Sequence, residues 1–309
     1  MTRKYDELKA IFEHFDDRKA RALERQSADP RSCWCFALLG FTSAVPELRI
    51  EPLAIFRKVV EPPGEVELAG ALRDGHLLAS VSRYSHMITH ELAIYPGERF
   101  DTKFVFNFSW WIISALRVRT LAELLVPVAA NTSWSVISAA ADHSVDVKFV
   151  EDIPRAHRFG PPVVVTENDL LWVENNIIVF VELLEVQCFR FAVEALSTCS
   201  FQSSRRMSSA LIWSGIESLF NIKGELKFRL ATYIASLLEA RGQARVDMYK
   251  KITKLYDFRS KAVHGDSVTD TDVSEHICLI RVILSRLLCK IVELGKVPSK
   301  LELESAVFQ

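Results

Sequence analysis

The spacing of apolar and polar positions changes once along the chain, close to residue 166. Before this point, short apolar runs are separated by turn-forming clusters such as Pro62-Pro63-Gly64, a pattern typical of strands and short helices. After it, apolar residues recur every three or four positions and proline is absent until Pro298, which is typical of helices. The pattern predicts an α+β protein, with a mixed α/β domain at residues 1–165 and an all-α helical bundle at residues 166–309.

The N-terminal domain is expected to combine a surface helix with a small sheet. The helix spans residues 2–26, where apolar positions stand among dense charges, and it ends at Asp29-Pro30. The other predicted elements are strands within residues 34–41, 77–81, 88–95 and 145–150, one or two helices within residues 110–141, and a proline-bearing boundary loop at residues 154–162.

The C-terminal domain is expected to be a bundle of long helices. In the last of them the apolar residues form one broad face, and Asp272 with Glu275 has the spacing of a capping box at the helix start. The apolar face consists of Ile277, Ile280, Ile283, Leu284, Leu287, Leu288 and Ile291. The helices are predicted at residues 167–197, 203–221, 225–241, 247–263 and 273–294.

The composition is that of a globular chain, with 49% apolar and 25% charged residues. A formal net charge of -1 gives no general attraction to nucleic acid, so RNA binding would need a local basic patch. The charged N-terminus has no apolar signal segment and the apolar runs are too short to cross a bilayer, so we expect a cytoplasmic protein with no membrane partner. The six cysteines are few for this length and are expected to be reduced, buried thiols.

One short segment carries the most specific chemical signal in the chain. It reads Lys254-Leu-Tyr-Asp-Phe-Arg-Ser-Lys-Ala-Val-His-Gly265, so that four residues separate Arg259 from His264. Such a pair is weak evidence by itself, because Arg83 and His90 form a second pair of comparable spacing in a strand-like segment. The residues around Arg259 therefore have to distinguish the two pairs.

The context of Arg259 resembles the Apea-like type of the HEPN family. Tyr256, Arg259 and the pair His264-Gly265 stand at that family's spacing, and Glu217 precedes Leu219-Phe220 as an acidic residue does in the family's preceding helix. The resemblance covers residues 191–294, roughly a third of the chain. The N-terminal half shows no such resemblance, and a role in sensing or in substrate selection is expected for it.

The resemblance implies a metal-independent endoribonuclease that uses no cofactor and leaves 2′,3′-cyclic phosphate and 5′-hydroxyl ends. It also implies RNA as the substrate, a homodimer formed through the HEPN domain, and a setting in stress response or phage defence. A related HEPN class has a tyrosine two residues after the histidine and acts with a nucleotidyltransferase. Position 266 is Asp266 here, so no nucleotidyltransferase partner is expected.

The two motif residues suit the chemistry of RNA cleavage. Arg259 would hold the phosphate through its planar guanidinium, and His264 would act as general base or acid because histidine titrates near neutral pH. Five positions along a continuous helix correspond to about 140°, so the two side chains would diverge unless the helix ends. Gly265 is a helix-ending signal that would leave His264 in the final turn, free to turn back toward Arg259. A two-fold axis would supply a second histidine.

Further residues are expected to support this site. Ser260 follows the arginine, Tyr256 lies one helical turn before it, and Glu217 could orient its guanidinium. Neighbouring cations form either a solvated face or a phosphate track toward the pocket, and the sequence leaves both open. The RNA-binding candidates are Lys261, Lys254, Lys250 and Arg206.

Other functions have weaker support in the residues. The main alternative is a non-catalytic HEPN module that binds RNA or protein through the same dimer, and a small-molecule switch in the N-terminal half stays open. His86 and His90 have a metal-binding spacing on a helix, but their neighbours predict a strand, so no metal site is expected. Cys33 and Cys35 lack a second cysteine or histidine pair at zinc-finger spacing.

Overall fold

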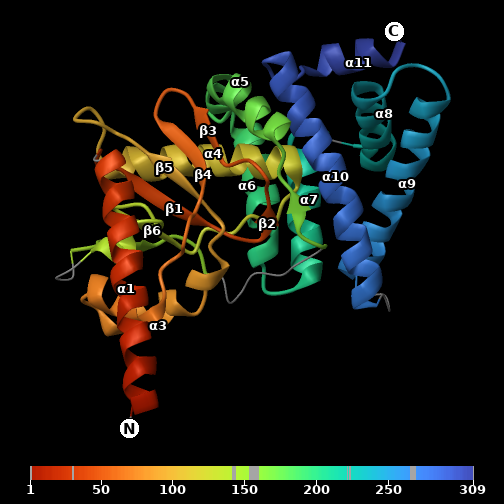
Figure 1. Ribbon diagram of the computed structural model, residues 1–309. Coiled ribbons are helices and arrows are strands. Elements are labelled where there is room, and N and C mark those ends of the chain that lie inside the picture. The colour runs from red at the N-terminus through yellow and green to blue at the C-terminus, as the bar shows by residue number, and fades with distance from the viewer. Residues whose placement is uncertain are drawn as a thin grey trace. The chain divides into compact units, whose positions relative to one another are not determined.

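The computed structural model describes residues 2–29, 31–140, 144–152, 160–220, 222, 224–264 and 269–308. The chain divides into two compact units. Unit 1 comprises Met1–Ser109 and Leu124–Ile153, and unit 2 comprises Trp110–Glu123 and Pro154–Gln309. The main sheet lies in unit 1 and the long helices after residue 166 lie in unit 2, so the fold is α+β (Figure 1).

Unit 1 contains one long helix, an antiparallel sheet and several short helices. Helix α4 begins in this unit and continues into unit 2. The elements are α1 (Thr2–Ala28), β1 (Trp34–Leu38), β2 (Phe41–Thr42), β3 (Glu47–Ile50), β4 (Ala54–Lys58), α2 (Glu65–Ala71), α3 (Gly75–Ser82), the 3₁₀ helix η1 (Ser85–Met87), β5 (His90–Ile94), α4 (Thr102–Thr120), β6 (Val128–Ala130), the 3₁₀ helix η2 (Ile137–Ala139) and β7 (Val147–Phe149).

Within the residues that the structure describes, the sheet of unit 1 has the strand order β3-β4-β5-β1-β6-β7, and neighbouring strands are antiparallel. Leu92 in the middle of β5 pairs with Phe36 on one side and Phe56 on the other. All three side chains are fully buried. Every residue of β5 is buried, as expected for a central strand covered on both faces.

The sequence pattern located some of these strands and misread one segment. Strands β1, β5 and β7 lie within the predicted ranges 34–41, 88–95 and 145–150, and β2 begins at the end of the first range. Strands β3, β4 and β6 were not predicted. The predicted strand at residues 77–81 is wrong, because these residues belong to helix α3. The Asp74 carboxylate accepts hydrogen bonds from the backbone N–H groups of His76 and Leu77, so Asp74-Gly75 caps a helix where a strand-turn boundary was expected.

Unit 2 is built around the long helix α10. In Figure 1, α10 runs between the pair α6 and α7 on one side and the pair α8 and α9 on the other. The elements that follow residue 160 are β8 (Val163–Val164), α5 (Glu167–Leu183), α6 (Gln187–Thr198), the 3₁₀ helix η4 (Cys199–Phe201), α7 (Arg205–Ser218), α8 (Leu226–Leu238), α9 (Gln243–His264), α10 (Asp270–Leu294) and α11 (Lys300–Phe308).

The predicted core face of the last helix is confirmed, since every residue named for it is buried in α10. Its predicted start is wrong by three residues. Thr269 is the N-cap and forms the capping box with Asp272, so the helix begins before the Asp272 and Glu275 pair. Gly295 ends the helix in the left-handed conformation, at φ 67°.

The predicted helix at residues 167–197 is wrong as a single element, because α5 ends at Leu183 and α6 begins at Gln187. The Arg190 guanidinium donates to the Leu184 carbonyl at 2.7 Å and thereby satisfies a carbonyl at the end of α5. No proline or glycine lies in residues 184–186, so the local sequence contains no breaking signal. Helix α11 was not predicted either.

Close helix packing in unit 2 depends on one glycine. A Cβ atom on Gly215 of α7 would lie 2.9 Å from the Ala195 Cβ and 3.3 Å from the Ala192 Cα of α6. Both distances are shorter than ordinary van der Waals contact, so only glycine allows α7 to approach α6 this closely.

The end of α4 and the following residues are joined to α10 by specific polar contacts. Arg281 forms an ion pair with Glu123 at 3.1 Å and donates to the Leu121 carbonyl at 3.0 Å. The Ser285 hydroxyl donates to the Val118 carbonyl at 2.6 Å. These contacts explain why residues 110–123 belong to the helical unit although they precede most of it in the sequence. Among the residues described, no helix combines the length and apolar character needed to span a membrane.

Candidate functional site

Arg259 of α9 and Glu217 of α7 face each other within unit 2. Arg259 Nη2 lies 3.3 Å from Glu217 Oε1, and about a quarter of each side chain is exposed, 25% and 24%. Charge-assisted hydrogen bonds between nitrogen and a carboxylate are usually shorter, about 2.7–2.9 Å. The pair is therefore loose, and the guanidinium can exchange Glu217 for another anion without losing a tight bond.

Tyr256 completes this cluster from one turn earlier on α9. The guanidinium carbon of Arg259 lies 5.5 Å from the centroid of the Tyr256 ring, within cation–π range. Hydrogen bonding also links the Tyr256 hydroxyl with the Glu217 carboxylate. The structure thus brings together Arg259, Tyr256 and Glu217, which the sequence had named separately.

Two further residues, Trp213 and His276, which the sequence did not indicate, support this cluster through packing and a hydrogen bond. Trp213 lies one turn before Glu217 on α7 and meets the Tyr256 ring edge-on, with centroids 5.3 Å apart. Its indole Nε1 donates to His276 Nε2 of α10 at 2.9 Å. Phe258 stacks on the His276 ring at 4.6 Å. The four-residue spacing could have identified Trp213, but nothing in the sequence marks His276, because its contact joins two separate helices.

Burial controls the protonation of this cluster. Burial raises the pKa of the Glu217 carboxyl, although the Arg259 charge and the Tyr256 hydrogen bond oppose that rise. Burial and the negative charge of Glu217 raise the pKa of Tyr256, so the phenol keeps its proton at neutral pH. Burial lowers the pKa of His276 to about 4, and its imidazole is neutral at pH 7.

The His276 imidazole should make unit 2 sensitive to acid. A histidine in the unfolded chain binds a proton near pH 6.5, whereas the folded one resists protonation down to about pH 4. The unfolded chain therefore gains protons first as the pH falls. We expect this group to lower the free energy of unfolding by up to about 3 kcal/mol between pH 6.5 and 4, and to have no effect above pH 7.

His276→Gln should flatten that dependence, because glutamine keeps an acceptor for the Trp213 indole but does not titrate. Urea unfolding at several pH values, followed by far-UV circular dichroism, measures the slope. His76→Gln, at an exposed position on α3, is the matched control and should keep the wild-type slope. Equal slopes for His276→Gln and wild type would show that His276 does not govern acid sensitivity.

The predicted RNA-binding lysines lie on a different face of α9 from Arg259. At about 100° per residue, Lys250, Lys254 and Lys261 fall roughly 180° to 220° around the helix axis from Arg259. All three are exposed. Arg206 lies half-buried in the first turn of α7. The lysines therefore form a solvated stripe of their own, and within one copy they do not line the Arg259 cluster.

Helix α9 is described as far as His264. The predicted helix stop at Gly265 lies outside the described residues. The His264 side chain lies outside the described residues, as do Gly265 and Asp266. Ser260 is half-buried in the turn after Arg259.

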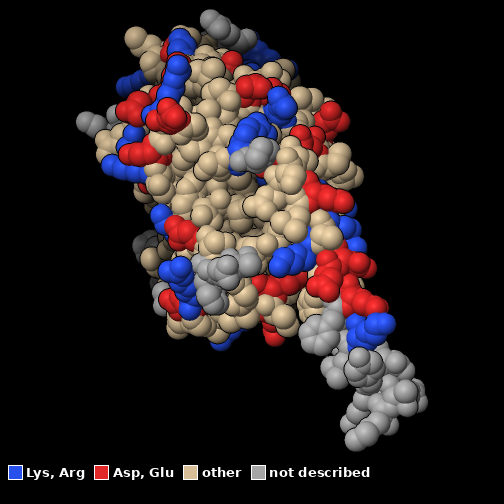
Figure 2. Space-filling model, turned by 60° about the vertical axis from the view of Figure 1, so that its left-hand side comes forward, with Lys and Arg blue, Asp and Glu red and all other residues tan. Residues whose placement is uncertain are grey.

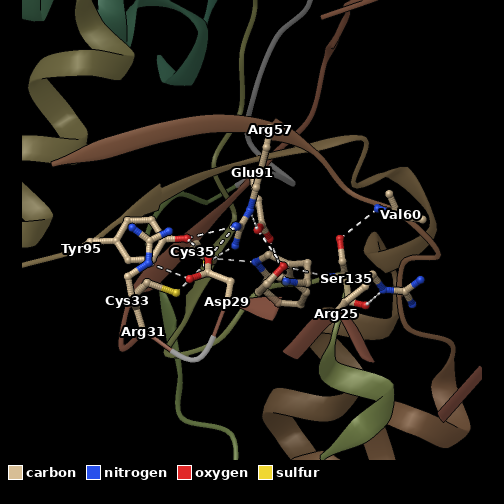
Figure 3. Close-up of polar contacts among 12 residues, drawn as sticks. Arg25, Asp29, Arg31, Cys33, Cys35, Arg57, Val60, Glu91, Tyr95 and Ser135 are labelled. Atoms are coloured by element: carbon tan, nitrogen blue, oxygen red, sulfur yellow. Dashed lines mark hydrogen bonds and ion pairs between the residues drawn. The ribbon is translucent and has the colours of Figure 1, made fainter. Parts of the chain in front are cut away.

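Unit 1 contains a second cluster of charged side chains, centred on Glu91 of β5 (Figure 3). The Glu91 side chain is completely buried. It accepts hydrogen bonds from Arg57 Nε at 2.6 Å, from the Ser133 hydroxyl at 2.7 Å and from the Trp134 backbone N–H at 2.7 Å. These donors satisfy the oxygens of a carboxylate that has no access to water.

Arg57 connects Glu91 with Asp29 at the end of α1. Its Nη1 donates to Asp29 Oδ2 at 3.1 Å and to the Tyr95 hydroxyl oxygen at 3.0 Å (Figure 3). Arg31 binds the other oxygen of Asp29 at 2.7 Å and stacks over the Tyr95 ring. Burial alone would raise the pKa of Asp29, but hydrogen bonds from Arg31, Tyr95 and Arg57 outweigh it and hold the pKa well below its usual range.

This cluster forms part of the wall of a cavity of about 990 Å³ in unit 1. Hydroxyl groups are frequent around the cavity, but those of Ser133 and Ser135 are already bonded to Glu91 and to the Val60 backbone N–H. Over the described part of the face drawn in Figure 2, Lys and Arg side chains are interspersed with Asp and Glu side chains and form no separate basic patch.

The side chains that could have suggested a metal site, His90 and the pair Cys33 and Cys35, are buried among other groups. His90 is buried with its ring beside those of Phe41 and Phe56, at 5.3 and 5.0 Å, and burial lowers its pKa. Cys33 and Cys35 are free, buried thiols with their Sγ atoms 3.4 Å apart, and burial raises the pKa of Cys35. No group of three potential metal ligands occurs in the part of the chain that the structure describes.

Comparison of the chain with protein-family models, with curated proteins and with solved structures gives no significant match. The class to which the protein belongs therefore rests on the motif around Arg259 and on the helical unit that contains it.

Proposed function

We propose that this chain is a metal-independent endoribonuclease of the HEPN type, with Arg259 and His264 as its catalytic pair. The observation that carries the proposal is the environment of the Arg259 side chain, that is, its exposure and its ion pair. The Arg259 side chain is about a quarter exposed, its guanidinium is held only loosely by Glu217, and it lies on α9, the helix that also carries His264. A phosphate can therefore take the place of the Glu217 carboxylate.

A second arginine of the same chain shows what a purely structural guanidinium looks like. Arg57 has a side chain only 17% exposed, and its Nε and Nη1 form close bonds to Glu91, Asp29 and Tyr95. Arg259 Nε, in contrast, is buried and has no hydrogen-bond acceptor among the residues described. This difference supports a ligand-binding role for Arg259.

The proposed cleavage needs no metal. His264 takes the proton from the 2′-hydroxyl as the 2′-oxygen attacks phosphorus, and Arg259 stabilises the additional negative charge on the phosphate oxygens. The bond from phosphorus to the 5′-oxygen breaks, and that oxygen receives a proton to become a 5′-hydroxyl. The other product end is the 2′,3′-cyclic phosphate. Glu217 and Tyr256 position Arg259 before the phosphate binds, and Ser260 is proposed to bind the phosphate beside it.

A homodimer belongs to the proposal. One histidine cannot act as base and acid in the same step, so a second copy would supply the second imidazole across a two-fold axis. The proposed setting, by resemblance, is a cytoplasmic stress response or defence against phage.

One observation favours a second candidate, a non-catalytic HEPN module that binds RNA or protein. Lys250, Lys254 and Lys261 form an exposed stripe that faces away from Arg259. Such a stripe can attract RNA without leading it into the Arg259 cluster.

Incubation of the full chain with total RNA in excess EDTA distinguishes the two functions. The nuclease is expected to produce new fragments whose ends are 2′,3′-cyclic phosphate and 5′-hydroxyl. Binding without cleavage at every protein concentration would leave the interaction module as the better description. Cleavage that stops in EDTA would contradict the metal-independent mechanism.

A further inference from the structure

Two adjoining cavities of unit 2 form a cleft that begins at Glu217. The first, of about 850 Å³, is lined by residues of α6 and α7 and by the start of α11. The second, of about 560 Å³, extends along the start of α8. Phe220, Ile222 and Lys300 line both cavities, so the two lie side by side. We call the two adjoining cavities together the α6–α11 cleft.

The wall of the cleft offers an accessible aromatic ring. Phe191 lines the first cavity and is 38% exposed, and its neighbour on the wall, Val186, is 40% exposed. Phe220 lies deeper and is nearly buried, at 6%. Large apolar side chains are not normally left open inside a concave surface unless a ligand covers them. A nucleobase fits such a wall, because every base presents a flat face for stacking.

Positive charges lie further along the same cleft. Lys300 is exposed, and its Nζ lies 3.7 Å from the Glu304 carboxylate. Arg229 in the second cavity lies 3.5 Å from Glu225 through its Nε. Exposed ion pairs of this length contribute little to stability, so both cations can bind a phosphate instead.

The arrangement favours one kind of occupant. Bases in a double helix are stacked inside and cannot reach a wall such as Phe191, whereas bases of a single strand can turn outward. Apolar and aromatic surface combined with cations is the pattern of single-strand binding sites. At its near end the cleft reaches Glu217, the partner of Arg259.

We infer that the α6–α11 cleft binds the single-stranded RNA that flanks the cleaved phosphate, with a base against Phe191 and the backbone phosphates on Lys300 and Arg229. The inference rests on the proposed function, because Arg259 is taken as the group that holds the cleaved phosphate. It adds the substrate class, single-stranded RNA, and a path for the strand away from the site.

Binding of a short, fluorescein-labelled single-stranded RNA to the full chain tests the inference by fluorescence anisotropy. The His264→Ala background prevents cleavage during the measurement. In that background, Phe191→Leu and Lys300→Gln should each raise the Kd about tenfold, since loss of one stacked base or one phosphate contact has an effect of this order. Phe191→Tyr keeps an aromatic ring and should bind like the parent.

Matched controls lie in the same unit. Phe228 is 58% exposed and Lys290 pairs loosely with Glu293 at 3.4 Å, and neither residue lines the cleft. Phe228→Leu and Lys290→Gln should leave the Kd within about twofold of the parent, as expected of surface positions outside the contact. Far-UV circular dichroism of every variant confirms that unit 2 is folded.

Different outcomes would reject the assignment of the cleft and the proposal of nuclease activity. Equal Kd values for the cleft variants and the controls, or no RNA binding by any form, would overturn the cleft assignment. Wild type that cleaves RNA with a KM unchanged by Phe191→Leu would overturn the cleft and leave the nuclease standing. Cleft-dependent binding by a wild type that never cleaves would support the cleft and reject the nuclease.

Discussion

Replacing Arg259 with alanine is expected to slow RNA cleavage by a factor of about 10² to 10⁴. The guanidinium is the only group of its cluster that can neutralise charge developing on phosphorus, because Glu217 is acidic and Tyr256 keeps its proton. Folding should change little, since Arg259 is 25% exposed and its single ion pair is long. Single-turnover cleavage rates in EDTA measure the effect, and thermal unfolding checks the fold.

Matched variants separate a chemical role from a general charge effect. Arg286 of α10 is also ion-paired and partly exposed, at 2.8 Å from Glu239, but lies in neither the cluster nor the cleft. Arg286→Ala should therefore cleave at the wild-type rate. Arg259→Lys should remain slow, because an ammonium group lacks the planar fork that binds two phosphate oxygens. His264→Ala should lose activity to a similar degree.

Unchanged cleavage by Arg259→Ala would contradict the catalytic role of the motif. If Arg259→Ala cleaves RNA as fast as wild type, Arg259 is a structural helix residue and any nuclease activity belongs to another site. Loss of activity accompanied by loss of folded structure would also count against the prediction, because a loose surface pair should not support the fold.

Replacing Arg57 with methionine is expected to lower the free energy of unfolding of unit 1 by about 3–5 kcal/mol. The change leaves Glu91 as a completely buried carboxylate that keeps only the Ser133 and Trp134 donors. It also removes a bond to Asp29 at the end of α1. Urea unfolding measures the loss, and hydrogen exchange of peptides from β1, β4 and β5 assigns it to unit 1.

An exposed arginine of the same unit provides the comparison. Arg21 pairs with Glu61 at 2.8 Å, but 44% of its side chain is exposed. Arg21→Met should therefore leave the urea midpoint of unit 1 close to that of the wild type. The double variant Arg57→Met with Glu91→Leu should recover part of the loss, because no charge is then left buried without its partner. Equal effects of Arg57→Met and Arg21→Met would contradict the role assigned to the buried pair.

Local sequence patterns predicted the elements that depend on neighbouring residues. The apolar face of α10 was predictable because a helix repeats every 3.6 residues and one face has to be buried. The same reasoning failed for α3, since Asp74-Gly75 is compatible both with a turn between strands and with a helix cap.

The candidate site was only partly visible in the sequence. The motif named Arg259, Tyr256 and Glu217, and their proximity follows from the packing of α7 against α9. His276 could not be found in this way, because the histidine is marked only by the Trp213 indole that reaches it from another helix. The motif likewise gave no sign that Lys250, Lys254 and Lys261 face away from Arg259.

The sequence by itself determined the α+β class, the change to helices after residue 166 and the residues on the core face of α10. Only the tertiary structure decided which side chains meet: Arg57 with Glu91, Trp213 with His276, and residues 110–123 with α10. The physical reason is the range of the interactions. Periodicity and capping depend on residues within one or two turns, whereas ion pairs and close packing depend on how separate elements approach one another.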